Sequence, residues 1–256
     1  MKRIFIGIGA AVLAVLIAGL ALLPGVLEGQ INRIVDGVPI DITEEARARH
    51  GELAVVDLHA DTLLWARDPL DRADRGHVDL PLLVDGNVTL QVFSVVTKVP
   101  RDQRYTGTSG DSDVITLLAM VQRWPARTWD SLFERALYQA EKLHRAEDAA
   151  SGDLTIVRSA ADIDRLIAAR GDGNRPVGGL LATEGSHPLE GRIENVEMLY
   201  AAGYRMMGLT HFFDNELAGS MHGLDKGGLT PLGREVVGRM ERVGMIVEIA
   251  HRSHEC

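Results

Sequence analysis

Acidic and imidazole side chains alternate along a short segment of the chain. Asp57, His59 and Asp61 occupy every second position of the sequence DLHADT, and alternate residues of a β-strand face the same side. An imidazole and a carboxylate two residues apart can both reach one divalent metal ion. A polar strand end that faces solvent would show the same pattern, so this segment by itself leaves both interpretations open.

A further carboxylate follows another expected strand, in the segment LLATEGSHP. Glu184 comes directly after an apolar run that ends at Ala182. A carboxylate at such a position can bridge two metal ions through its two oxygens, although a charge after a strand is commonly a solvated loop residue or a helix cap. His187, three residues later, is better explained as a hydrogen-bonded structural histidine.

Two more histidines end apolar runs, His211 in YRMMGLTH and His251 in MIVEIAH. Together with His59, three of the nine histidines therefore follow apolar strand runs. In an α/β barrel the active site lies at this same end of every strand, and chance placement of all three is a poor explanation. Five others lie in loops or helices, where a structural role is expected: His50, His77, His144, His222 and His254.

The elements that must position these residues alternate between strands and helices. Short apolar runs predict strands, and longer segments with helical spacing predict helices, one of which opens with the capping pattern SAAD. Such alternation is typical of a parallel sheet covered by helices. The expected strands are 53–58, 88–96, 154–157, 177–182, 204–209 and 245–250, and the expected helices are 112–124, 128–147, 159–170, 191–202 and 231–243.

The predicted fold is a TIM-type (β/α)8 barrel of the α/β class. A closed barrel needs eight strands, whereas the apolar runs supply about five or six. The barrel is therefore expected to be incomplete at the C-terminus, with residues 51–256 as its N-terminal part. For these residues by themselves we expect poor folding and no activity, because an open barrel exposes the edges of its first and last strands.

The N-terminal segment differs from the rest of the chain. Lys2 and Arg3 precede a run of 24 uncharged residues, 4–27, which is long enough to span a bilayer. The basic flank places the remainder on the periplasmic or extracellular side of the membrane. Residues 1–30 are thus interpreted as a signal anchor or transmembrane helix, and 31–50 as a linker with a lead-in helix. A cleaved signal peptide is the alternative, but its apolar region is usually about 7–15 residues long.

Composition excludes several other classes of protein. The chain has 256 residues, a formal net charge of −9 and a single cysteine, Cys256. No stripe of Lys and Arg stands out, so a nucleic-acid partner is not expected. One cysteine excludes intrachain disulfides and cysteine-based zinc ribbons. The sequence leaves the oligomeric state open, a homodimer included.

Four short motifs, in their order and spacing, resemble the membrane dipeptidase family of zinc peptidases: DLHADT, EGSH, LTHFFDN and IVEIAH. The segment GHVDLPLL at 76–83 is also similar to a stretch that these proteins carry after the first strand. The resemblance runs from about residue 50 to the C-terminus. It implies two Zn²⁺ ions per complete protein, a dipeptide substrate, and hydrolysis by a hydroxide that bridges the metals.

The resemblance also implies a role for each motif residue. His59 and Asp61 would bind one zinc ion, Glu184 would bridge both, and His251 would bind the second. His211 would contact the substrate and polarise its carbonyl group, and the metals and the imidazole together would stabilise the tetrahedral oxyanion.

Residues around these ligands have less specific expectations. Asn215 lies in the glycine-rich, polar segment 212–230, where it either contacts the substrate or only satisfies the loop backbone. Asp57 and Glu248 are expected to support the ligands without binding metal, and Glu248 stands where the family often has Asp. The family's further histidine for the second zinc ion, and an acid that handles protons, have no counterpart up to Cys256.

Two other functions remain open at this point. The first is another binuclear-metal amidohydrolase on the same barrel, a deacylase or a lactonase. Those enzymes usually open with His-x-His, and a modified lysine often bridges their metals, whereas this chain has His-x-Asp and a glutamate. The second is a membrane-tethered binding protein that has lost catalysis.

Overall fold

A parallel β-sheet forms the centre of the protein. The computed structural model describes residues 2–35 and 37–255, so the cysteine considered above, Cys256, lies outside the described residues. Six strands within this part form one sheet, and every strand pairing is parallel. In spatial order the main strands are β1 (Val55–Ala60), β2 (Val88–Val95), β4 (Val177–Thr183), β5 (Tyr204–Gly208) and β6 (Ile246–Glu248), and β3 (Leu154–Ile156) pairs with the first half of β4.

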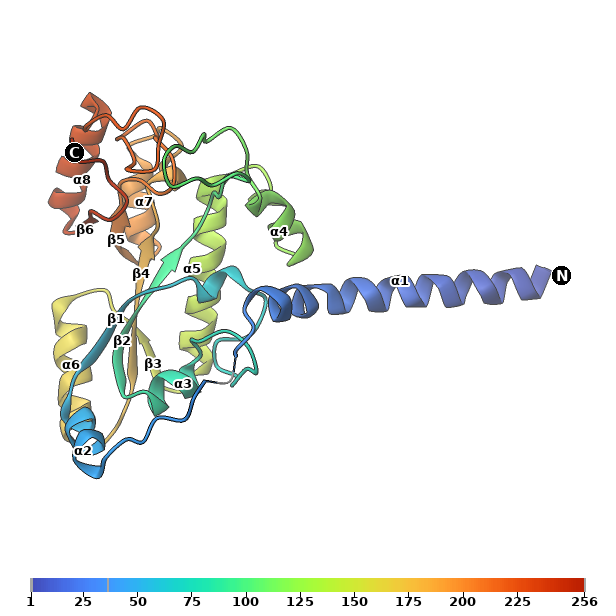
Figure 1. The fold of residues 1–256 in the computed structure, drawn as a ribbon, viewed down its shortest axis with the longest axis horizontal. Helices are drawn as coiled ribbons and strands as arrows, with labels where there is room; N and C mark the ends of the chain where they lie inside the picture. Colours follow the sequence, from blue (N-terminus) through green and yellow to red (C-terminus); the bar gives the residue numbers. More distant parts are fainter. Residues whose placement is uncertain (1, 36, 256) are drawn as a thin grey trace.

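Helices connect consecutive strands and cover the sheet (Figure 1). The longest covering helix is α5, which carries seven buried residues. The α-helices are α1 (Lys2–Ile31), α2 (Glu44–Glu52), α3 (Leu80–Asp85), α4 (Ile115–Val121), α5 (Leu132–Ala149), α6 (Ala160–Gly171), α7 (Asn195–Ala201) and α8 (Pro231–Val243). Three short 3-10 helices are η1 (Thr62–Leu64), η2 (Ala126–Thr128) and η3 (His187–Leu189).

Adjacent residues of the central strands pack into different cores on opposite faces of the sheet. Phe93 and Leu181 belong to the main core, which they form with side chains of α5, α7 and α8. Their neighbours Val92 and Leu180 pack instead with Leu166 of α6. Figure 1 shows α5 and α6 on either side of the sheet. This two-sided cover explains why β4 is buried along its whole length, as expected for a strand in a parallel α/β sheet.

The strand order places the sheet in the barrel class that the sequence predicted. Strands β1, β2, β4, β5 and β6 follow one another in space as they do in the chain. Within the described residues β1 pairs only with β2, and β6 only with β5. The sheet is therefore a curled part of an α/β barrel with two open edges.

Several elements differ from their predicted bounds for local reasons. The last predicted strand is shorter, so His251 lies in a turn with φ of 60° rather than at a strand end. Helix α5 begins only at Leu132, because η2 occupies the preceding residues 126–128 and the N-cap residue Ser131 is extended. Helix α3 was not predicted; it starts where Asp79 accepts a hydrogen bond from the backbone N–H of Leu82. A capping acid followed by a proline in the first turn is a helix-start signal that GHVDLPLL did contain.

One helix of the described part, α1, is long and apolar enough to cross a membrane, with a mean hydropathy of 2.2 over its apolar window. Its described side chains from Val12 to Leu23 are exposed, whereas Pro24 and Glu28 are buried. Glu28 Oε1 lies 2.8 Å from Arg67 Nε, and Arg75 Nε donates to Glu28 Oε2 at 3.3 Å. The last turns of α1 are therefore packed into the globular part. We call Glu28, Arg67 and Arg75 the Glu28 clamp.

A serine cap starts α5 and offers a modest test of the fold. The Oγ of Ser131 accepts a hydrogen bond from the backbone N–H of Glu134 at 3.1 Å and donates to Glu190 Oε1 at 2.9 Å. We expect Ser131→Ala to lower the free energy of unfolding by about 1 kcal/mol, because the helix loses its N-cap acceptor. Urea denaturation measures this change. Ser131→Thr keeps the hydroxyl and is the control; equal losses in both variants would contradict the capping role.

Candidate metal centre

The carboxyl ends of four strands bring the candidate ligands together. His59 lies near the end of β1, and Glu184, His211 and His251 follow β4, β5 and β6. The Nε2 atoms of the three histidines lie 3.7, 3.3 and 3.3 Å from one carboxylate oxygen, Glu184 Oε1. Residues that are 192 positions apart in the chain thus meet at one edge of the sheet, as a parallel barrel requires.

The donor atoms form two overlapping groups around Glu184. One contains His59, Asp61 and Glu184, and the other contains Glu184, His211 and His251, with the donor atoms of each group within 4.8 Å of one another. Imidazole nitrogen and carboxylate oxygen are the donors that zinc takes in proteins. A carboxylate shared by two donor groups also suits a pair of metal ions. The residues present therefore supply three donors for one divalent ion in the His59 group, and Glu184 and His251, with His211 beside them, in the other group.

His211 is a buried, uncharged member of this cluster. Burial, reinforced by the neighbouring His251 and His187, lowers the pKa of His211 to about 3. Its Nδ1 atom is buried and makes no hydrogen bond of good geometry among the described residues, although the backbone of Lys98 lies near enough to act on the ring. A neutral imidazole carries one N–H and one lone pair. The Nε2 atom beside Glu184 can therefore donate to a substrate oxygen or coordinate a metal ion, depending on the tautomer.

His59 differs from His211 in both exposure and charge. Its side chain is exposed and lies at the open edge of the sheet. Its Nε2 is 3.1 Å from Asp61 Oδ1. This hydrogen bond raises the pKa of His59 to about 9, against a smaller lowering by burial. The ring is protonated at neutral pH when no metal is present. A divalent ion would displace that proton, because metal binding requires the neutral imidazole.

Two further carboxylates hold the backbone next to the ligands. Asp57 Oδ1 accepts a hydrogen bond from the backbone N–H of His59 at 3.1 Å. Glu248 Oε1 accepts one from the backbone N–H of Ala250 at 2.5 Å. Neither belongs to the two donor groups, and these contacts are of the kind expected from supporting residues. Since β1 ends at Ala60, Asp61 starts the turn that follows rather than continuing the strand face.

Asn215 makes hydrogen bonds to its own loop and to the turn after Glu184. Its Nδ2 donates to the carbonyl oxygen of Leu209 at 2.8 Å and to Ser186 Oγ at 3.2 Å. Its Oδ1 accepts from the backbone N–H groups of Leu217 and Ala218 at 2.9 and 3.1 Å. These four bonds correspond to the loop-supporting alternative; contact with a substrate remains a prediction.

Two other histidines lie close to the centre and were expected to be structural. His187 is stacked on Phe213, with ring centroids 4.3 Å apart, and burial lowers its pKa to about 3. His222 is stacked on Phe212 at 4.9 Å, and its ring centroid lies 5.6 Å from that of His251. His222 thus packs beside a candidate ligand from a loop 29 residues earlier in the chain. Its sequence context, a glycine-rich loop, gives no signal of that proximity.

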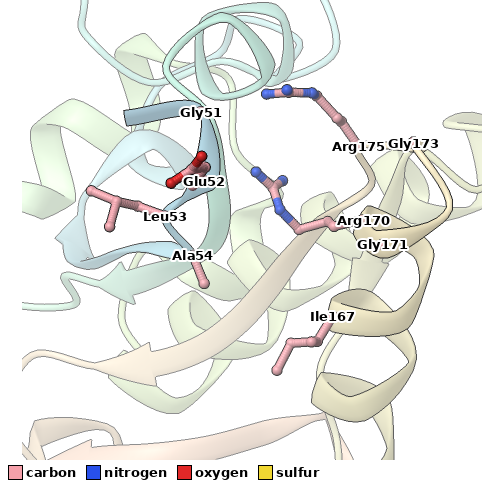
Figure 2. A pocket seen from close by; sticks show the side chains of 9 residues that line it. All are labelled: Gly51, Glu52, Leu53, Ala54, Ile167, Arg170, Gly171, Gly173 and Arg175. Atoms are coloured by element: carbon pink, nitrogen blue, oxygen red, sulfur yellow. The ribbon is translucent and has the colours of Figure 1, made fainter. Parts of the chain in front are cut away.

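Cavity size does not identify the centre. A cavity of 260 Å³ is lined by His59, Glu184 and His251, and one of 340 Å³ lies beside Asp57 and Asp61. A larger one, of 420 Å³, lies at the start of β1 and the end of α6 (Figure 2). This cavity therefore lies at the amino ends of the strands. None of the candidate ligands lines it.

Comparison with known proteins gives a family match and several relatives. The sequence profile of the membrane dipeptidase family, peptidase family M19, matches residues 43–256. The dipeptidase tcpJ of Claviceps purpurea is 24% identical over 234 residues, which is 90% of this chain and 50% of that protein. The dipeptidase aclJ of Aspergillus oryzae is 26% identical over 212 residues, 78% of this chain and 45% of that protein. The chain spans about half the length of these curated relatives.

Solved structures share the fold at low sequence identity. A metallopeptidase from Rhodobacter sphaeroides, liganded with a phosphinate mimic of the dipeptide L-Ala-D-Ala, has a TM-score of 0.59 and 21% identity, covering 79% of this chain and 60% of that one. The dipeptidase AC, a family M19 metallopeptidase, has a TM-score of 0.57 and 22% identity, covering 79% and 58%. The family match and these folds confirm the resemblance and the α/β barrel class. This chain belongs to the membrane dipeptidase family, peptidase family M19.

Proposed function

We propose that the chain carries a binuclear zinc centre that hydrolyses dipeptides. The observation that supports this most directly is that two donor groups share a single carboxylate, Glu184. In the proposal His59 and Asp61 hold one ion, His251 holds the other and Glu184 bridges them. When bound, the two ions would supply an activated water and a Lewis acid for the peptide carbonyl.

His211 is proposed to act on the substrate rather than on the metal. Its ring is neutral because burial lowers its pKa to about 3. With the proton on Nε2, it can donate a hydrogen bond to the substrate carbonyl oxygen and stabilise the negative charge that develops there. Phe212 lies edge-on to this ring at 4.7 Å between centroids and limits the ring's freedom to turn away.

Metal removal from the full-length protein tests the proposal. We expect hydrolysis of L-Ala-D-Ala and L-Ala-L-Ala to stop after dialysis against a chelator and to return when two equivalents of Zn²⁺ are added. The reason is that the activated water and the Lewis acid are both supplied by the metal ions. Release of free alanine is the measurement. Full activity in the metal-free protein would contradict the proposed mechanism.

The same assay separates the alternative functions. An N-acetyl amino acid and a lactone test the deacylase and lactonase alternatives. Cleavage of these substrates in preference to both dipeptides would favour another amidohydrolase activity. Tight binding of two zinc ions with no turnover of any substrate would favour a binding protein.

We also propose that residues 1–256 by themselves do not catalyse the reaction. Large apolar side chains at the two open sheet edges are exposed, among them Leu58 on β1 and Ile246 on β6, at 67% and 53%. Unpaired strand edges with exposed apolar side chains favour association with other chains. We therefore expect this segment to aggregate without detergent and to show no dipeptide hydrolysis.

Helix α1 is proposed to anchor the protein in a membrane through residues 4–27, with the catalytic part on the periplasmic or extracellular side. Its run of uncharged residues and the basic pair Lys2 and Arg3 support this orientation. The Glu28 clamp supports retention of the helix, since it ties the end of α1 to the globular part.

A further inference from the structure

The burial of α1 changes at the point where a membrane span would end. A bilayer core takes about 20 helical residues, so a core that begins at Ile4 would end near Leu23. The described side chains from Val12 to Leu23 are exposed, and Pro24 is the first buried one. The described apolar side chains from Val12 onward are thus free for lipid up to Pro24, where burial of side chains against the globular part begins.

Helix α4 lies against α1 at this level. The Nη2 of Arg123 donates to the carbonyl oxygen of Ala21 at 3.1 Å, and the two helices are in contact. Figure 1 shows α1 projecting from the globular part on the side where α4 lies. Arg123 therefore places a cation at the expected boundary between hydrocarbon and headgroups, a position that arginine side chains favour.

The outward face of α4 is apolar. Ile115 and Ala119 are buried in a small core with Trp124, whereas Leu117 and Met120 on the other face are 68% and 41% exposed. Such a pair of faces is expected of a helix that is packed on one side and meets lipid on the other. Because α4 contacts α1, whose described side chains from Val12 to Leu23 are exposed, a lipid surface that surrounds α1 would also reach this face of α4.

We propose that α4 rests in the headgroup region of the same bilayer that α1 crosses, with Leu117 and Met120 inserted and Arg123 beside lipid phosphates. This inference rests on the proposed membrane anchor. The Glu28 clamp would then fix the tilt of the globular part, so that the metal centre is held in one orientation to the membrane. The occupant of the α4 face is the lipid itself.

A fluorescent probe on α4 tests this contact. The full-length protein, in which Leu117→Cys is the only cysteine because Cys256 and any cysteine after it are replaced by Ser, is labelled with an environment-sensitive dye. It is then reconstituted into vesicles of phosphatidylcholine and phosphatidylglycerol. Ile167→Cys is the matched control, since Ile167 is a 54% exposed apolar residue on α6. We expect spin-labelled lipid, but not aqueous iodide, to quench the fluorescence of the dye at position 117. At position 167 we expect iodide, but not the spin-labelled lipid, to quench it.

Carbonate extraction of the same vesicles separates the two proposals. Retention of the protein together with quenching of the 117 dye by lipid supports the α4 contact. Retention with a 117 dye as open to iodide as the 167 dye overturns the contact and leaves the anchor standing. Release by carbonate overturns both. Protection from iodide that grows with protein density, without quenching by lipid, would assign the α4 face to a second copy of the chain and overturn the lipid contact.

Discussion

Glu184→Gln is expected to remove both zinc ions and to lower dipeptide hydrolysis about a thousandfold, equivalent to about 4 kcal/mol of transition-state stabilisation. The reason is geometric, since Glu184 Oε1 is the one atom that all three candidate histidines approach. An amide keeps the size of the side chain but replaces one oxygen by a group that cannot coordinate. The oxygen that remains is an uncharged, weaker donor that can serve one ion at most, so a single substitution removes the bridge and weakens both donor groups.

A second variant, which changes a ligand of one donor group only, provides the comparison for this test. Asp61→Asn changes the His59 group and leaves the His251 group intact, so we expect it to weaken one zinc equivalent and spare the other. Glu241→Gln, at an exposed position on α8, is the control for loss of a carboxylate. Metal content by mass spectrometry, alongside turnover, is the measurement. Two ions held at unchanged affinity in Glu184→Gln would show that Glu184 is not the bridge.

The strand positions could be predicted from the sequence because each strand is a compact apolar run. Residues 177–182, for example, form all of β4 except its last residue, Thr183, and the strand is buried throughout. The meeting of Glu184, His211 and His251 also followed from the fold class, since parallel strands end at one edge of the sheet. The prediction needed only their order after the strands, and not the details of packing.

Contacts that depend on loop conformation could not be predicted in the same way. Asn215 reaches the turn after Glu184 through its bond to Ser186, and His222 reaches the ring of Phe212. Both residues belong to the segment 212–230, where no hydrophobic period fixes the backbone. Local side-chain bonds decide such a loop, and they become visible only when the surrounding strands are in place.

The end of α1 shows a different limit of sequence analysis. Glu28 is the first charged residue after the uncharged run 4–27, and nothing in the sequence predicts a partner for it. In the structure its side chain is 2% exposed and that of Arg67 is 7% exposed. Glu28 lies at the end of α1, whereas Arg67 comes from the turn after η1. The two residues are about 40 positions apart in the chain. Pairing at that distance depends on the tertiary fold.

Glu28→Ala is expected to lower the free energy of unfolding by about 3 kcal/mol, because it leaves buried arginine without its carboxylate. Arg67 would retain Asp79 as its one carboxylate, whose Oδ2 is 3.8 Å from its Nη1, and the hydrogen bond that its Nη2 donates to the carbonyl oxygen of Val78 at 2.8 Å. Urea denaturation of the full-length protein in detergent measures the loss. Glu52→Ala, at an exposed position on α2, is the control and should change stability by no more than about 0.5 kcal/mol.

A double variant distinguishes a lost ion pair from a lost packing contact. Replacing a buried ion pair by apolar residues of similar volume is often neutral or stabilising, whereas removal of one partner is costly. Glu28→Leu with Arg67→Met should therefore recover most of the stability that Glu28→Ala loses.

N-terminal sequencing of the mature protein tests whether the Glu28 clamp is retained. A first residue downstream of Glu28 would show that the clamp is removed during maturation, and it would establish the cleaved signal peptide in place of the anchor.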